Sequence, residues 1–191
     1  KNVILLTIDT FRRDVIGAYG AKTGVTPFLD SIQDKCIRFT KCQSVAPYTQ
    51  ASFPGILTSS YLYDYAKTGS GPAADALSPR RRLISEAVSE AGLKAAAFHS
   101  NPYLCGFFGW ERGWETFYDS MEADVTPHCP YVKGDAINAK ADAWLAAHAK
   151  DDKPFFLWTH YMDIHEPYVP ERRYVERVAP AIDMSADEMF N

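Results

Sequence analysis

The chain has 191 residues, of which 47% are hydrophobic and 23% are charged. These proportions are typical of a globular domain and exclude a disordered or fibrous chain. Twenty Lys and Arg residues against 24 Asp and Glu residues give a net charge of −4. Nucleic acid is therefore not an expected partner, because proteins that bind it usually carry a basic excess. No apolar run approaches the roughly 20 residues that a membrane span needs.

Four cysteines are spread along the chain: Cys36, Cys42, Cys105 and Cys129. They form no CxxC pair and no zinc-knuckle spacing, and they are too sparse for a disulfide scaffold. Cys36 and Cys42 could meet across a tight turn, but two buried thiols are the simpler expectation. This cysteine usage favours the reducing cytoplasm. The chain begins at Lys1 with no secretory signal, although a signal already removed would leave the same sequence.

Three segments have the composition of strands buried on both faces of a parallel sheet: residues 3–8, 95–99 and 155–161. A short strand is also expected over residues 37–40. Polar composition predicts exposed loops over residues 65–77 and 119–130.

Helix start signals lie between the predicted strands. Thr26-Pro27 and Ser78-Pro79 each place an N-cap residue before a proline, and Gly92 ends the second of these helices. A third helix is expected over roughly residues 135–149. A fourth should start near Ser52 or Phe53, because Pro54 is tolerated only in a first turn. This alternation predicts an α/β fold, a three-layer αβα sandwich with a mostly parallel sheet.

Polar and ionisable side chains follow each predicted strand. They are Asp9 and Arg12 after the first strand, Ser100 and Asn101 after the second, and His160, Asp163 and His165 at the third. Open α/β sheets bind ligands beyond the carboxyl ends of their strands. Carboxylates and imidazoles together indicate a metal or anion site there, although each residue alone is more simply a loop cap.

Residues 46–58 have the pattern of a loop that enters a helix. Thr49 and Ser52 then lie at the helix N-terminus, where backbone N–H groups and the helix dipole favour an anion. Taken alone, the two hydroxyl groups are more simply helix caps.

Several stretches, in order along the chain, resemble the sulfatase and alkaline phosphatase superfamily. They are residues 2–20, 26–30, 46–49, 56–58, 90–98 and 154–168. The resemblance implies an alkaline-phosphatase-like fold and a metal-dependent hydrolase that acts on a small phosphate or sulfate ester. Asp9 matches a metal ligand of that family, and Thr49 matches its nucleophile.

The same resemblance suggests further roles. His165 matches the family's His-x-Pro motif, whose imidazole contacts the transferred or leaving group, and Ser100 and Asn101 fall where polar substrate contacts are found. Asp163 is a candidate ligand for a second metal. Arg12 either approaches an anionic substrate or supports its loop through Asp14. His160 is a weaker candidate for the substrate site, because a hydrogen-bonded histidine in the core explains its position equally well.

Two departures from sulfatases proper affect the expected chemistry. Residues 49–53 read Thr-Gln-Ala-Ser-Phe in place of the Cys/Ser-x-Pro-x-Arg motif, so no formylglycine is expected. Thr10 stands where those enzymes carry a second metal-binding Asp. Threonine nucleophiles are familiar in the superfamily's phosphodiesterases and phosphotransferases. A divalent metal (Ca²⁺, Mg²⁺, Mn²⁺ or Zn²⁺) on Asp9 and Thr49 would activate the hydroxyl group.

The family's further metal ligands, an Asp followed by His or Asn, have no counterpart in this sequence. We therefore expect residues 1–191 to be the N-terminal portion of a catalytic domain, incomplete at the C-terminus. Such a sheet should expose apolar surface to a partner or to self-association. Two classes of function stay open. The first is an enzyme, either a hydrolase, a phosphodiesterase or a phosphotransferase, and the second is a catalytically incompetent binding module.

Overall fold

The computed structural model describes residues 1–61, 76–122, 125, 130–168 and 170–178. The chain forms two compact units. The sheet unit comprises residues 1–9 and 44–163, and the second unit comprises residues 10–43 and 164–191. Most of the two predicted loops, 65–77 and 119–130, lies outside the described residues, and so does Cys129. The described residues contain no helix long and apolar enough to cross a membrane.

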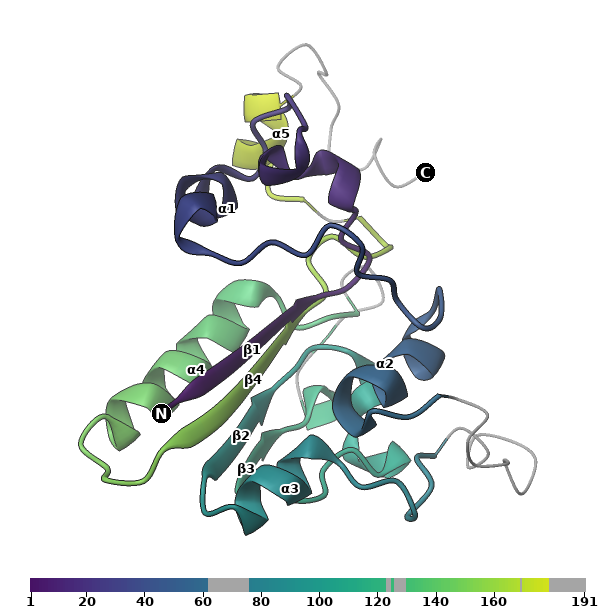
Figure 1. The fold of residues 1–191 in the computed structure, drawn as a ribbon. Helices are drawn as coiled ribbons and strands as arrows, with labels where there is room; N and C mark the ends of the chain where they lie inside the picture. Colours follow the sequence, from purple (N-terminus) through teal and green to yellow (C-terminus); the bar gives the residue numbers. More distant parts are fainter. Residues whose placement is uncertain (62–75, 123–124, 126–129, 169, 179–191) are drawn as a thin grey trace. The chain divides into compact units, whose positions relative to one another are not determined.

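A parallel sheet organises the first unit. Its strands are β1 (Val3–Ile8), β2 (Lys94–Phe98), β3 (Thr116–Tyr118) and β4 (Phe155–Tyr161), in the spatial order β1-β4-β2-β3 (Figure 1). Every neighbouring pair is parallel, which confirms the predicted sheet. The strand β3 was not predicted, because three residues are too few to show a pattern.

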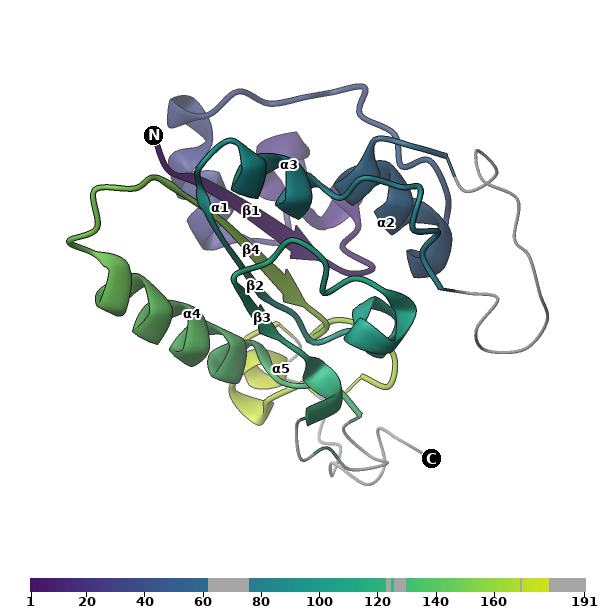
Figure 2. The same ribbon diagram turned by 90° about the horizontal axis from the view of Figure 1, so that it is seen from below.

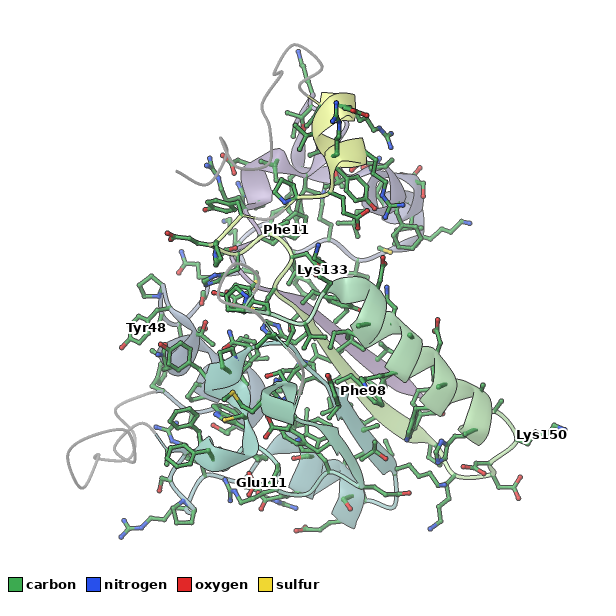
Figure 3. The ribbon with its side chains drawn as sticks, turned by 180° about the vertical axis from the view of Figure 1, so that it is seen from behind. Phe11, Tyr48, Phe98, Glu111, Lys133 and Lys150 are labelled. Atoms are coloured by element: carbon green, nitrogen blue, oxygen red, sulfur yellow. The ribbon has the colours of Figure 1, made fainter. Side chains whose placement is uncertain are left out.

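Helices cover both faces of this sheet. The helices α2 (Thr49–Thr58) and α3 (Ile84–Glu90) lie on one face, and α4 (Gly134–His148) lies on the other (Figures 1 and 2). Side chains alternate between the faces, as a strand requires: Trp158 packs with α2 and α3, whereas Leu157 packs with α4. Phe98 packs on the face beneath α4, and Lys133 and Lys150, which flank this helix, are labelled in Figure 3. The three-layer αβα sandwich is thus confirmed.

Two helix starts differ from their predictions. The helix α3 begins at Ile84 and not at Pro79, because residues 78–81 form a turn that is closed by Arg81 N–H donating to Ser78 O. The backbone N–H of Leu83 then donates to Glu86 Oε2 at 2.8 Å and starts the helix. The helix α2 begins at Thr49 and contains Pro54 at its sixth position, at the cost of one backbone hydrogen bond. The end of α3 is as predicted, because Gly92 adopts φ +86° directly after the C-cap residue Ala91.

The strand β1 is less buried than its composition predicts. The side chains of Val3, Ile4 and Leu6 are 48%, 58% and 56% exposed. The reason is position, since β1 is the edge strand and pairs with β4 alone within the described sheet. Burial on both faces was therefore wrong for β1, whereas the expectation of exposed apolar surface at this sheet is confirmed.

Short helices and loops make up the rest. The second unit contains α1 (Pro27–Ile32), α5 (Arg172–Val178) and 3-10 helices at Arg13–Val15, Gly17–Tyr19 and Gln33–Lys35. The sheet unit has 3-10 helices at Pro102–Leu104, Gly106–Phe108 and Ser120–Glu122. The predicted strand over residues 37–40 is wrong, because this segment has no strand partner. Cys36 and Cys42 are exposed free thiols, so their predicted burial is also wrong.

Candidate active site

The carboxyl ends of β1 and β4 lie side by side. Thr7 pairs with His160 and Ile8 pairs with Tyr161 in the parallel register. The next residue, Asp9, donates its backbone N–H to Tyr161 O at 2.9 Å. This bond fixes Asp9 at the sheet edge where α/β proteins bind their ligands.

Three polar side chains surround one carboxylate oxygen, Asp9 Oδ2. The hydroxyl group of Thr49 donates to it at 3.2 Å, and the amide Nδ2 of Asn101 donates to it at 2.9 Å. Nε2 of His160 lies 3.6 Å from the same oxygen. The structure therefore brings together four of the predicted site residues, from β1, the start of α2, the end of β2 and β4.

Thr49 is the first residue of α2. The preceding residue, Tyr48, is extended at φ −144° and ψ 156°, and its carbonyl accepts the N–H groups of Ala51 and Ser52. Thr49 thus lies in the first turn, where helix amides and the dipole favour negative charge. Ser52 lies one turn inside the helix, with its hydroxyl group donating to Thr49 O at 3.4 Å.

The side chain of Asn101 is held in one orientation. It is 1% exposed, and its Oδ1 accepts the N–H of Tyr103 at 2.9 Å as the cap of a 3-10 helix. Nδ2 therefore faces Asp9 and also lies 3.3 Å from Met162 Sδ. Because the cap assigns the oxygen, the amide group presents a hydrogen-bond donor to Asp9.

His160 is completely buried beside these groups. Nδ1 lies 2.9 Å from Thr7 Oγ1, which also receives Nε1–H of Trp158 at 3.0 Å. The ring of Phe53 packs against the imidazole in a T-shaped arrangement, with a centroid distance of 5.0 Å. Thr7 was not predicted as a site residue. Its position two residues before Asp9, on the same strand face, was the available signal.

Two further predicted residues make local hydrogen bonds. Ser100 is buried and donates its hydroxyl group to His160 O at 3.2 Å, which ties β2 to β4. Asp163 Oδ1 accepts the N–H of Gly134 at 2.9 Å, at the start of α4. A Cβ at Gly134 would lie 2.9 Å from Asp163 Oδ2, so a larger residue there would require the carboxylate to shift.

Arg12 and His165 belong to the second unit. Arg12 forms an exposed pair with Asp14, in which Nε donates to Oδ1 at 2.9 Å. This hydrogen bond is the main cause that lowers the pKa of Asp14. Nδ1 of His165 lies 2.6 Å from Glu166 O.

His99 is a second buried histidine in the sheet unit. Its ring stacks on Trp158 at an interplanar angle of 12°, and neither ring nitrogen has a hydrogen-bond partner among the described residues. Burial lowers the pKa of His99 to about 4, so the ring is neutral at pH 7. The core behind the site therefore holds no charge at this position.

The oxygen atoms around Asp9 are of the type that hard cations bind. Asp9 supplies a carboxylate and Thr49 a hydroxyl group, which is fewer than the six to eight ligands of calcium, for example. Within the described part of the chain, no three His, Cys, Asp or Glu side chains lie close enough to hold a metal ion. A metal bound here would take its remaining ligands from elsewhere.

Solved structures with the same fold include BT4656, which was solved in complex with its substrate D-glucosamine-2-N,6-O-disulfate. It is 19% identical, with a TM-score of 0.72, over 96% of this chain and 38% of the other. The phosphonate monoester hydrolase of Agrobacterium radiobacter is 17% identical, with a TM-score of 0.66, over 91% and 43%. The lipoteichoic acid synthase LtaP from Listeria monocytogenes is 19% identical, with a TM-score of 0.68, over 98% and 45%.

A protein of the alkaline phosphatase superfamily from Vibrio parahaemolyticus matches as well, at 18% identity and a TM-score of 0.67 over 90% of this chain and 42% of the other. These similarities show the alkaline-phosphatase-like fold, and the chain spans less than half the length of each of these solved structures. No curated protein matches the sequence. The family model described as Sulfatase matches residues 1–185. That match extends over nearly the whole sequence and includes Asp9, Thr49, Asn101 and His160. The chain therefore belongs to the sulfatase family.

Proposed function

We propose that this chain supplies the nucleophile and the first metal ligand of a hydrolase that cleaves phosphate or sulfate esters. One observation carries the proposal: the Thr49 hydroxyl group lies in the first turn of α2 and donates to Asp9 Oδ2 at 3.2 Å. This contact orients the hydroxyl oxygen, and the helix N-terminus favours the charge of an anionic ester. Membership of the sulfatase family supports hydrolysis in general terms.

In the proposed reaction, Thr49 Oγ1 forms a bond to phosphorus or sulfur while the bond to the leaving oxygen breaks. The hydroxyl proton passes to the Asp9 carboxylate, and Asn101 Nδ2 holds that carboxylate in place. The leaving oxygen takes up a proton and departs as the alcohol. Water then attacks the threonine ester, and its hydroxyl group joins the released phosphate or sulfate. The proton on Asp9 returns to Thr49 Oγ1, and the remaining water proton replaces the one taken up by the alcohol.

We propose that Asp9 and Thr49 also contribute to a divalent metal site. The metal would be Ca²⁺, Mg²⁺, Mn²⁺ or Zn²⁺, and it would supply Lewis-acid activation of the ester and of the hydroxyl group. The proximity of Asp9 and Thr49 supports this assignment. Asp163 remains a proposed ligand of a second metal.

Residues 1–191 are proposed to form the N-terminal portion of a sulfatase-like catalytic domain. Their match to less than half of each solved relative is consistent with this. His165 as an acid for the leaving oxygen, and Arg12, Ser100 and His160 as substrate contacts, are proposals that rest on the resemblance. A small sulfate or phosphate ester is the proposed substrate, and a sulfated sugar is the substrate named for BT4656. The cytoplasmic location stays a prediction from the sparse cysteines.

A phosphotransferase is the second candidate, since LtaP is a lipoteichoic acid synthase of similar fold. An acceptor alcohol would then replace water in the second step. The threonine at the nucleophile position favours this candidate as much as hydrolysis, because either acceptor can resolve the same ester.

The test is hydrolysis of nitrophenyl sulfate and of nitrophenyl phosphate mono- and diesters with each of the four metals, with and without glycerol as an acceptor. It is run on residues 1–191 and on any longer native form. Thr49→Ala should lower the rate at least about 10³-fold, and Thr49→Ser should retain part of it. A phosphorylated or sulfated Thr49 peptide in quenched samples would support the covalent step. An unchanged rate in Thr49→Ala would reject this nucleophile, and inactivity under all conditions would favour a binding module.

A further inference from the structure

The two ring nitrogens of His160 face different neighbours. Nδ1 lies 2.9 Å from Thr7 Oγ1, and Nε2 lies 3.6 Å from Asp9 Oδ2. The side chain is 0% exposed, and among the described residues Nε2 has no hydrogen-bond partner. A nitrogen that is both buried and unpaired costs free energy unless it interacts with a nearby group. The nearest charged group to consider is therefore the Asp9 carboxylate.

The hydroxyl group of Thr7 decides which nitrogen of His160 carries the proton. Nε1–H of the buried Trp158 can only donate, so Thr7 Oγ1 accepts it at 3.0 Å. The hydrogen of Thr7 then points either to His160 Nδ1 at 2.9 Å or to Thr159 O at 3.4 Å. The shorter contact favours Nδ1, which makes Nδ1 an acceptor.

The carboxylate on the other side of the ring leads to the same conclusion. If Nε2 were unprotonated, its lone pair would face Asp9 Oδ2, and the two electron-rich atoms would repel each other. If Nε2 carries the proton, it faces an acceptor. A neutral imidazole holds one proton, so both contacts are favourable only when that proton is on Nε2.

We propose that Thr7 holds His160 in the Nε2–H tautomer, and that His160 is thereby a positioning residue for Asp9. The contact of 3.6 Å is longer than a hydrogen bond, and a shift of roughly 0.5 Å would bring it into range. His160 therefore guides the carboxylate toward the place where it meets Thr49. The catalytic meaning of this role rests on the proposed function, whereas the tautomer does not.

Phe53 and Trp158 keep the imidazole in this orientation. The rings of Phe53 and His160 meet at an interplanar angle of 72°, and Trp158 stacks on the imidazole with a centroid distance of 6.0 Å. Neither neighbour competes for Nε2, since the indole N–H of Trp158 is already directed to Thr7. The ring is thus held by apolar contacts. Its Nδ1 faces Thr7 on β1, and its Nε2 faces the carboxylate of Asp9, which follows β1.

Long-range ¹H–¹⁵N NMR of the ¹⁵N-histidine-labelled chain tests the tautomer directly. The signals of His160 are assigned by their loss in His160→Gln, or by sequential assignment if that variant does not fold. We expect Nδ1 at the shift of an unprotonated nitrogen and Nε2 at that of a protonated one. The reverse pattern would overturn the proposal, whatever the outcome of the ester assays.

Variants at both ends separate positioning from simple packing. Thr7→Ser keeps the hydroxyl group and should keep the tautomer, whereas Thr7→Val has a similar shape without it and should give a mixture. Asp9→Asn should move the Nε2 signals, and unmoved signals would exclude the contact with Asp9. In a preparation that binds Mn²⁺, Thr7→Val should lower the affinity about 10–100-fold and Thr7→Ser should restore it. Equal tautomers in Thr7→Ser and Thr7→Val would remove Thr7 from the proposal.

Discussion

The side chain of Asn101 joins the end of β2 to the end of β1 through Asp9. Its Nδ2 donates to Asp9 Oδ2 at 2.9 Å, while its Oδ1 accepts the N–H of Tyr103 at the same distance. The amide is buried, and each of its two hydrogen bonds is partly buried. The link allows the two partners of Asn101 to be tested separately.

Asn101→Asp keeps the acceptor for Tyr103 but places a second carboxylate against Asp9. We expect the free energy of unfolding to fall by about 1–3 kcal/mol at pH 7, because a donor becomes a repelling acceptor. The loss should shrink near pH 3, where carboxylates are protonated. Urea denaturation at both pH values measures it. Asn2→Asp is the control, since exposed Asn2 only accepts the N–H of Phe155. An equal loss at both pH values would contradict the repulsion.

His99 should make the fold sensitive to acid. Its folded-state pKa of about 4 lies below the 6.5 of an unfolded chain, so the unfolded state binds a proton first. The stabilising effect of neutral His99 is complete above pH 6.5 and is lost as the pH falls toward 4, by up to about 3 kcal/mol. His99→Leu should flatten the dependence of unfolding free energy on pH in this range. His148→Leu, on α4, is the control, and parallel curves for wild type and His99→Leu would reject the effect.

Asp163 should stabilise the start of α4. Asp163→Ala removes the acceptor for the N–H of Gly134 and is expected to cost about 0.5–2 kcal/mol in the absence of metal. Asp163→Asn keeps an oxygen acceptor and should cost less. Thermal unfolding in a chelating buffer compares them. If Asp163→Ala is as stable as the wild type without metal, the cap contributes nothing and a ligand role gains weight.

Ile4 and Leu6 should promote self-association. Both side chains lie on the sheet face that α4 covers, because Ile4 pairs with Leu157, which is buried beneath α4. The side chains of Ile4 and Leu6 are nevertheless more than half exposed. Exposed apolar residues on an edge strand invite pairing with another chain. The double variant Ile4→Thr/Leu6→Thr should lower the sedimentation coefficient at high protein concentration. The control is Phe107→Thr, which alters an exposed side chain elsewhere in the sheet unit. An equal decrease in the sedimentation coefficient for both variants would indicate nonspecific hydrophobic association.

Composition was sufficient to predict the long strands. The bounds of β1 and β4 agree with the sequence analysis, because their branched and aromatic runs are continuous. The start of α2 was misjudged because Pro54 was assumed to lie in the first turn, whereas the helix tolerates it at the sixth position. A rule for the position of proline considers one residue at a time. It does not include the packing of Phe53 and Leu57 in the core, which stabilises the helix around Pro54.

The site was predictable in its parts but not in its connections. The ends of the strands pointed to Asp9 and Asn101, and the resemblance pointed to Thr49. The contact between Thr7 and His160 depends on the register of β1 against β4, which sets residues 153 positions apart side by side. No local pattern encodes such a register, so only the folded chain shows it.

The register of β4 also constrains how this sequence can be aligned with others. Within β4, neighbouring side chains face opposite sides of the sheet, and His160 and Trp158 both lie on the side of Thr7. A single residue inserted or deleted within β4 before His160 would turn His160 to the opposite face, away from Asp9. An alignment that opens a gap there compares residues from opposite faces, and site assignments transferred through it would be false.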